Sequence, residues 1–200
     1  MTGFDALSAD KLRAELDPTI IGREIVVLEE TASTNDSVLE RISDSTPEGL
    51  VVFAERQTAG RGQRNNFWES AHGKGLWFSI LLRPKIDIGN SPRLSEWAAG
   101  TIAETISNEF ALPASVKLPN DVYVAEKKVA GVLVEMRAQK NAPHIAIVGI
   151  GVNVNHRLED FPEELRARAT SLAIALHRQI DRHQFAIALL RNLDRTYLKF

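Results

Sequence analysis

The sequence predicts an α+β fold in which a mixed, largely antiparallel β-sheet is packed with α-helices. Short runs of apolar, branched and aromatic residues cluster in the middle of the chain at spacings that favour hairpins, whereas helical periodicity appears early, centrally and late. Strands and helices therefore do not alternate as they do around a parallel sheet. The sequence also has no glycine-rich turn of the Rossmann or Walker type.

The composition fits one globular domain over residues 1–200. Hydrophobic residues make up 44% and charged residues 25%, and a formal net charge of −2 does not favour general nucleic-acid binding. Because the chain has no cysteine, it has no disulfides, thiolate metal sites or cysteine nucleophiles. No apolar run is long enough to span a membrane and the acidic N-terminal region is no signal peptide, so we expect a cytoplasmic protein.

The first part of the chain predicts a helix, a strand and a second helix. Residues 4–16 carry apolar side chains at helical spacing, and a short apolar run at residues 25–28 predicts the strand. The next residues, Ser33, Thr34 and Asn35, are of types that cap helices, and helical spacing follows them. Capping is the simpler explanation, and the alternative is that their hydroxyl and amide groups bind a small polar ligand.

Residues 51–84 hold a predicted strand, a long loop and a second predicted strand. Loops of this length inside a compact domain are usually functional or disordered. This loop combines Gly60, Arg61 and Gly62 with further basic residues and with the flat ring of Trp68. Glycine lets the backbone approach a ligand closely while a guanidinium reaches it, so the pattern indicates a site for an anionic, nucleotide-like ligand. A basic surface loop is the alternative.

The remainder of the chain predicts a long helix, a hairpin, a strongly apolar strand and closing helices. The predicted bounds are a helix at 91–110, strands at 122–124 and 129–136 with a turn at 125–128, a strand at 145–154, and helices at 163–169, 171–177 and 182–197. The strand at 145–154 contains two glycines, which suggest close approach by a ligand or by another segment of backbone.

Polar and glycine-rich motifs recur along the chain as Ser33-Thr34-Asn35, QTAGRG at 57–62, Trp68, KLPND at 117–121, KVAGVLVE at 128–135 and GIGVN at 149–153. Each motif alone is weak, but their order and spacing resemble the catalytic domain of the biotin protein ligases over roughly residues 25–195. The resemblance implies the class II synthetase-like biotin/lipoate ligase fold.

The resemblance further implies a two-step reaction with ATP and biotin as substrates. Biotin is first activated as biotinyl-5′-AMP, and its biotinyl group then passes to a lysine of a biotin carboxyl carrier protein, a subunit of acetyl-CoA carboxylase. Joining two anions in the first step needs cationic groups and implies Mg²⁺ around the phosphates. Members of the family often pair as homodimers through an edge strand, and the sequence does not identify that edge.

Individual residues also receive roles from the resemblance. Biotin would be bound or bordered by Ser33, Thr34, Asn35, Gln57, Gly60, Arg61, Gly62, Lys128 and Gly131. The nucleotide would be contacted by Arg61, Arg64, Trp68, Lys117, Asn120 and Asn153. The catalytic groups would be Arg61, Lys117 and Lys128, which oppose developing negative charge, and Asp121, which orients Lys128 or the acceptor lysine. The resemblance leaves the metal ligands unknown.

The sequence departs from the family pattern at Gln63, Asn65 and Leu118, where the family usually has arginine, glycine and tryptophan. The lost charge at Gln63 predicts weaker retention of the adenylate, Asn65 predicts a different closure of the loop, and Leu118 predicts different packing beneath its turn. No helix-turn-helix region precedes the matching region, so we expect no repressor role. A C-terminal SH3-like domain is expected to be absent or truncated.

Two other functions stay open at this point. A lipoate-protein ligase would share the fold family, although the thioester transferases of that group need a cysteine, which this chain lacks. The second is a binding protein for biotin or biotinyl-AMP with little turnover. Catalytic turnover with a carrier domain would separate that protein from a ligase.

Overall fold

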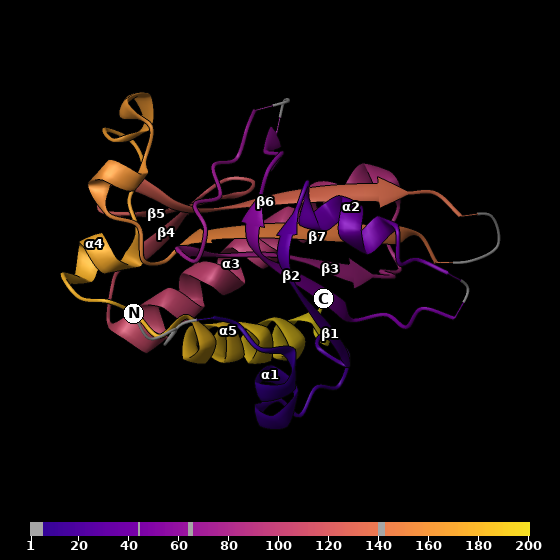
Figure 1. Ribbon diagram of the computed structural model, residues 1–200. Coiled ribbons are helices and arrows are strands. Elements are labelled where there is room, and N and C mark those ends of the chain that lie inside the picture. Colours follow the sequence, from indigo (N-terminus) through magenta and orange to yellow (C-terminus); the bar gives the residue numbers. More distant parts are fainter. Residues whose placement is uncertain (1–5, 44, 64–65, 140–142) are drawn as a thin grey trace.

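The computed structural model describes residues 6–43, 45–63, 66–139 and 143–200, and they form a seven-stranded mixed β-sheet with helices on both faces (Figure 1). The strands are β1 (Glu24–Thr31), β2 (Leu50–Gln57), β3 (Gly75–Leu82), β4 (Ala114–Lys117), β5 (Asp121–Val124), β6 (Lys127–Arg137) and β7 (Ile145–Asn153). Their order across the sheet is β1-β2-β3-β7-β6-β5-β4. Only β1 and β2 pair in parallel among these strands, so the predicted α+β class with a largely antiparallel sheet is confirmed.

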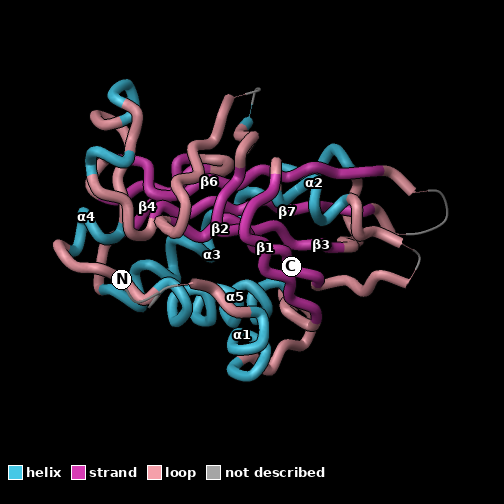
Figure 2. Tube along the Cα trace, viewed as in Figure 1, coloured by secondary structure: helices cyan, strands magenta, loops and turns pink. Residues whose placement is uncertain are grey.

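Helices cover the two faces of the sheet unequally (Figure 2). The helices are α1 (Ala9–Glu15), α2 (Thr34–Leu39), α3 (Ser91–Phe110), α4 (Leu172–Leu176) and α5 (Arg182–Tyr197), with short 3₁₀ turns η2 (Ile88–Asn90), η3 (Leu158–Asp160) and η4 (Glu163–Leu165). One face is covered by α3, α5 and α1, whereas α2 packs on β2, β3 and β7 from the other side. No helix among the described residues is long and apolar enough to cross a membrane.

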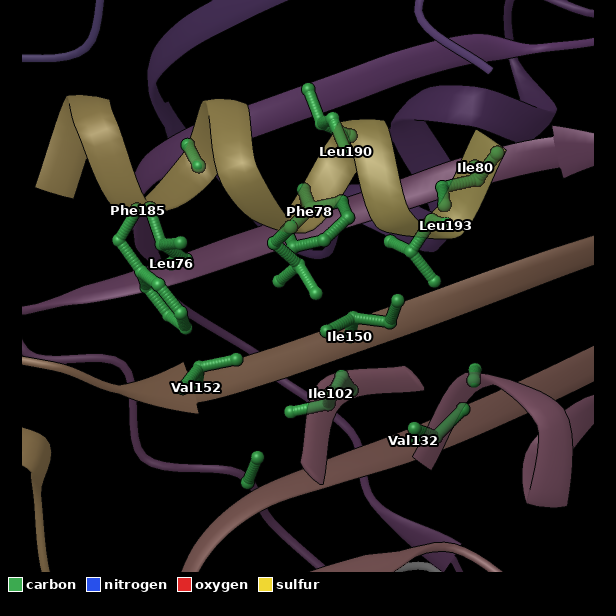
Figure 3. Close-up of a cluster of buried hydrophobic side chains, with 14 of the residues drawn as sticks. Leu76, Phe78, Ile80, Ile102, Val132, Ile150, Val152, Phe185, Leu190 and Leu193 are labelled. Atoms are coloured by element: carbon green, nitrogen blue, oxygen red, sulfur yellow. The ribbon is translucent and has the colours of Figure 1, made fainter. Parts of the chain in front are cut away.

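Every residue of β3 is buried, because both of its faces are covered. Leu76, Phe78 and Ile80 point toward α5, where they meet apolar side chains such as Phe185 and Leu190 in the main core (Figure 3). The residues between them belong to the opposite face, since neighbouring side chains of a strand alternate. Those residues include Trp77 and Ser79, and they form part of the site described below.

The helix predicted over residues 163–169 is wrong in its extent, because only η4 forms there. The chain makes one further turn after η4 and then pairs with β6. The carbonyl of Arg168 accepts a hydrogen bond from the Lys128 amide (2.8 Å), and the Thr170 amide donates to the Lys128 carbonyl (2.9 Å). Pairing with β6 thus replaces a continuing helix. The first helix is also shorter than predicted, since Ser8 caps α1 and residues 1–5 lie outside the described part.

The turn between β5 and β6 contains two residues instead of the predicted four. Ala125 and Glu126 adopt positive φ values of 47° and 64°, as a tight two-residue hairpin turn requires. Lys127 and Lys128 consequently belong to β6 and not to the turn. This difference matters, because a residue on a strand has its direction fixed by the pleat and by its neighbours.

Candidate active site

The floor of the candidate site is a strip of three glycines on the face that α2 covers. In the sheet register Gly151 pairs with Trp77 on one side and with Gly131 on the other, and Gly149 pairs with Ser79. A methyl group added at Gly149 would overlap the Asn35 side chain, and one added at Gly151 would lie 2.5 Å from the Trp68 ring. Both glycines are closely approached, but by side chains of this protein and not by the ligand or backbone segment that the sequence suggested.

The long loop after β2 is folded back on itself. Its Thr58 amide donates to the Thr31 carbonyl (2.9 Å), which fixes the start of the loop beside β1. Farther along, the Trp68 amide donates to the Gly60 carbonyl (2.9 Å), and a methyl group at Gly60 would lie 2.5 Å from the Trp68 carbonyl oxygen. Glycine at position 60 therefore lets the two arms of the loop come together.

Trp68 lies over the glycine strip and meets the edge of Trp77, with ring centroids 6.2 Å apart and an interplanar angle of 70°. A methyl group at Gly131 would be 2.9 Å from the same Trp68 ring. The buried indole Nε1 of Trp68 has no hydrogen-bond partner among the described residues. A buried donor without a partner is a place where a ligand or a water molecule is expected to supply an acceptor.

Buried polar groups at the start of α2 form one hydrogen-bonded wall of the site. The Thr34 amide (2.9 Å) and hydroxyl (3.1 Å) both donate to the Gln57 side-chain oxygen, and Gln57 Nε2 donates to Ser70 Oγ (3.0 Å). Ser79 Oγ lies within hydrogen-bonding distance of Thr34 Oγ1 (2.7 Å) and of Asn35 Oδ1 (2.5 Å). These bonds hold the side chains in fixed orientations, as recognition of a small polar ligand requires.

Ser33 occupies the N-cap position of α2, but its side chain makes no capping hydrogen bond. Capping, the simpler sequence-based explanation, therefore does not account for this hydroxyl group. Ser33 is buried and lines a small pocket together with Thr34 and Asn35.

Arg61 reaches from the loop to two carboxylates on different elements. Its guanidinium donates to both oxygens of Asp36 on α2 (2.6 and 2.8 Å) and lies 3.4 Å from the Glu135 carboxylate on β6. The hydrogen bonds from Arg61 lower the pKa of Asp36, and the same bonds raise the pKa of Arg61. Glu135 also accepts a hydrogen bond from Asn35 Nδ2 (2.8 Å), which joins this ion-pair cluster to the polar wall.

A β-bulge determines where Lys128 points. The β5–β6 register shifts so that Val122 pairs with Ala130 and Tyr123 with Lys128, which leaves Val129 as the extra residue on β6. Val129 and Ala130 both enter the main core although they are consecutive. Lys128 consequently shares the face of Gly131, where a methyl group at the glycine would lie 3.3 Å from the ammonium nitrogen.

The Lys128 ammonium lies between an acidic and an aromatic group. It forms an ion pair with Asp121 (2.7 Å) and lies 5.2 Å from the centroid of the Trp68 ring, within the range of a cation–π contact. Its backbone is fixed by the pairing with residues 168–170. Lys128 is therefore held by its neighbours and is not a freely solvated side chain of the hairpin turn.

The turn after β4 positions Asn120 and leaves two of its neighbours near solvent. The Asn120 side chain donates to the Val132 carbonyl (3.1 Å), and the Val132 amide donates to the Asn120 carbonyl (2.9 Å). Lys117 lies 5.6 Å from the Tyr123 ring centroid instead of in the small pocket. Leu118 is 70% exposed, so its side chain contributes little packing beneath this turn.

Two cavities meet at Lys128 and Trp68. The small pocket, of about 40 Å³, is lined among others by Ser33, Asn35, Gln57 and Arg61. The larger cavity, of about 510 Å³, is lined by Asp121, Asn153, Phe161 and further residues. Both lining sets include Lys128 and Trp68, so one ammonium group stands at the boundary between the two spaces.

The structure brings most of the proposed site residues to these cavities. Ser33, Thr34, Asn35, Gln57, Arg61, Gly62, Trp68, Asn120, Lys128 and Gly131 line the small pocket, and Asp121 and Asn153 line the larger cavity. Lys117 lines an adjoining groove of about 280 Å³, and Gly60 serves the fold of the loop. Arg64 and Asn65 lie outside the described residues.

Sequence reasoning assigned no role to Asp36, Ser79 or Glu135. Ser79 could have been noticed as the one polar residue within the apolar run 76–82, LWFSILL. Asp36 gave no such signal, and Glu135 appeared only as the last residue of the motif at 128–135. Neither could be linked to its partner Arg61, which is 25 and 74 residues away in the sequence. Among the described residues, no group of three or more His, Asp or Glu side chains could hold a metal ion.

The sheet, its covering helices and the polar pocket beneath the loop define a class of protein. Residues 27–153 match the model of the biotin/lipoate A/B protein ligase family. This match covers more than half of the chain, and the chain therefore belongs to that family.

The chain is also similar to individual members of the family. The chain is 37% identical over 191 residues to the bifunctional ligase/repressor BirA of Bacillus subtilis. The match covers 96% of this chain but only 59% of the length of the relative. It is 30% identical over 206 residues to the biotin–[acetyl-CoA-carboxylase] ligase of Mycobacterium tuberculosis, covering 96% of the chain and 74% of the relative. The biotin protein ligase of Aquifex aeolicus, solved with biotin and ATP, superposes with a TM-score of 0.77 at 35% identity and covers 89% of the chain and 72% of the solved one.

Proposed function

We propose that this protein is an ATP-dependent ligase that activates biotin and transfers it to a lysine of a biotin carboxyl carrier protein. The observation that carries the proposal is the position of Lys128 at the boundary between a small polar pocket and a cavity of about 510 Å³. A cavity of that size lies within the range of about 300–1,000 Å³ typical of small-molecule sites. A ligase of this class must bring a carboxylate and a phosphate together at such a boundary.

In the first step, a carboxylate oxygen of biotin attacks the α-phosphorus of ATP. A new C–O–P linkage forms, the bond to the β-phosphate oxygen breaks, and pyrophosphate leaves with the electron pair. The attack joins two anions, so an ammonium at their meeting point stabilises the transition state. Lys128 supplies this charge, and Asp121 holds its ammonium in place. Arg61, from the small pocket, neutralises the carboxylate and the phosphate.

In the second step, the amine of a carrier lysine attacks the carbonyl carbon of biotinyl-AMP. The amide bond forms, the mixed anhydride breaks, and AMP leaves with the electron pair while the amine loses a proton. Asp121 is half-buried beside Lys128 and lines the larger cavity, which supports a role in orienting the incoming amine. Any Mg²⁺ at this site would take most of its ligands from phosphate oxygens, as Mg²⁺ bound with nucleotides generally does.

The test is pyrophosphate release from ATP in the absence of any carrier protein, with biotin, with lipoate or with neither. Release with biotin alone is the expected result. Release with lipoate alone would move the protein to the lipoate ligases of the same family. No release, together with calorimetric binding of biotin, would favour a binding protein.

A further inference from the structure

We propose that Asp36 and Glu135 are positioning residues that hold Arg61 at the edge of the small pocket in the ligand-free protein and give it up to a bound carboxylate or phosphate. The identity of that anion rests on the proposed function, whereas the hold on Arg61 does not. We call these three side chains the Arg61 clasp.

The Arg61 clasp joins three separate parts of the site. Arg61 comes from the loop, Asp36 from α2 and Glu135 from β6. Arg61 meets Asp36 through two parallel hydrogen bonds of 2.6 and 2.8 Å, the fork geometry that a guanidinium forms with a carboxylate or a phosphate. The groups that a substrate would offer to Arg61 are therefore of the kind that it already binds.

The Arg61 clasp is also continuous with the pocket wall. Glu135 lies 3.4 Å from Arg61 and accepts a hydrogen bond from Asn35 Nδ2 (2.8 Å). Asn35 is only 3% exposed and lines the small pocket. A change in the Arg61 clasp therefore acts on the pocket through a direct hydrogen bond.

The charges of the Arg61 clasp favour an exchange of partners. Two carboxylates share one guanidinium, so an anion entering the pocket meets an edge that is negative overall while Arg61 stays between them. After an exchange Asp36, whose side chain is 42% exposed, is solvated by water, and Glu135 keeps its bond to Asn35. Exposed ion pairs contribute little to stability, so releasing Arg61 has a low cost.

The small volume of this pocket also supports an exchange of partners at Arg61. Its volume of about 40 Å³ is far below the roughly 300 Å³ at which small-molecule sites begin. Arg61 is part of its lining, so displacement of this side chain would make room for a larger ligand. Movement of Arg61 toward the anion creates room and delivers the positive charge in one step.

The first experiment tests the Arg61 clasp without any ligand. Trypsin cleaves after arginine only when the side chain is free to enter the protease, so cleavage after Arg61 is followed by mass spectrometry. We expect Asp36→Asn to raise the cleavage rate at this bond about two- to fivefold, the range for losing an exposed ion pair. Equal rates for the wild-type protein and Asp36→Asn would overturn the proposal.

Glu30→Gln is the matched control for this experiment. Glu30 pairs with Arg56 (3.0 Å) with both side chains about half exposed, and neither residue lines the small pocket. Glu30→Gln should leave cleavage after Arg61 unchanged. Glu135→Gln, which can still accept from Asn35, should raise it less than Asp36→Asn because its contact with Arg61 is longer.

The second experiment measures the exchange by calorimetry with biotin and with its neutral carboxamide. Asp36→Asn should bind biotin about two- to fivefold more tightly than the wild-type protein and should bind the carboxamide equally well, because only the carboxylate competes for Arg61. An equal change for both ligands would indicate a merely structural role and would overturn the exchange, as would unchanged or weaker biotin binding. If the wild-type protein binds no biotin, the proposed function fails, while the trypsin rates still decide whether the Arg61 clasp exists.

Discussion

The two faces of the sheet are built from alternate residues of the same strands, yet they differ in almost every physical respect. Toward α3 and α5, β3 presents Leu76, Phe78 and Ile80 to a continuous apolar core. Toward the loop, the same strand presents Trp77 and Ser79 to the glycine strip and the polar wall. One face removes apolar surface from water, and the other holds polar groups in fixed directions.

The difference shows how a small protein can separate stability from chemistry. Hydrophobic burial on the helix-covered face stabilises the sheet without directional demands. The site face can then tolerate features that stabilise little, such as glycines within a strand, a bulge beside Lys128 and an indole N–H without a partner among the described residues. Substitutions on the two faces should therefore have different consequences.

The largest effect on stability should come from the helix-covered face. Phe78→Ala should lower the free energy of unfolding by about 3–5 kcal/mol, because it empties a fully packed position. Ser79→Ala, one residue away, should cost about 1–3 kcal/mol by depriving Asn35 of a donor. Urea titrations measure both values, and calorimetry should show lowered biotin affinity only for Ser79→Ala. A loss of affinity in folded Phe78→Ala would contradict the separation of the two faces.

A buried histidine on the site face should make stability depend on pH. His156 is stacked on Phe161 and meets the edge of Trp77, and burial lowers its pKa from 6.5 to about 4. Below pH 6.5 the unfolded chain therefore binds a proton that the folded protein excludes. The stability that neutral His156 contributes is complete above pH 6.5 and is lost as the pH falls toward 4.

At pH 5 the resulting loss is about 2 kcal/mol relative to pH 8. His156→Phe, which keeps an aromatic ring in this place, should remove that part of the acid sensitivity. Urea denaturation of both proteins at pH 8 and pH 5 measures it. An identical pH dependence in the two proteins would rule out His156 as the cause.

A further pair of substitutions separates two glycines. Gly151→Ala should destabilise the protein by about 1–3 kcal/mol, because its methyl group would overlap the Trp68 ring. Gly100→Ala in the middle of α3 meets no atom within 4 Å and should stabilise by about 0.5–1 kcal/mol. Thermal denaturation reports both changes, and Trp68 fluorescence should shift only in Gly151→Ala. Similar behaviour of the two variants would argue against the glycine strip as a fitted floor.

Much of this arrangement could be predicted from the sequence, because periodicity is local. The helices predicted over residues 91–110 and 182–197 both appear with those bounds. The site was accessible only through motifs, since no local pattern reveals that Asp36 and Glu135 converge on Arg61. The direction of Lys128 also could not be predicted, because a bulge is a property of the strand pairing and not of the residues at 128–130.

The measurement that tests the account most directly is single-turnover pyrophosphate release by Lys128→Ala with saturating ATP and biotin. Lys127→Ala is the matched control. Lys127 is next to Lys128 in the sequence, but its ammonium is exposed and lines neither cavity. Loss of the boundary charge should slow release by about 10²–10³-fold while biotin affinity changes much less, and Lys127→Ala should resemble the wild-type protein. Release by Lys128→Ala at a rate near that of the wild-type protein would contradict the assignment of the reaction to this boundary.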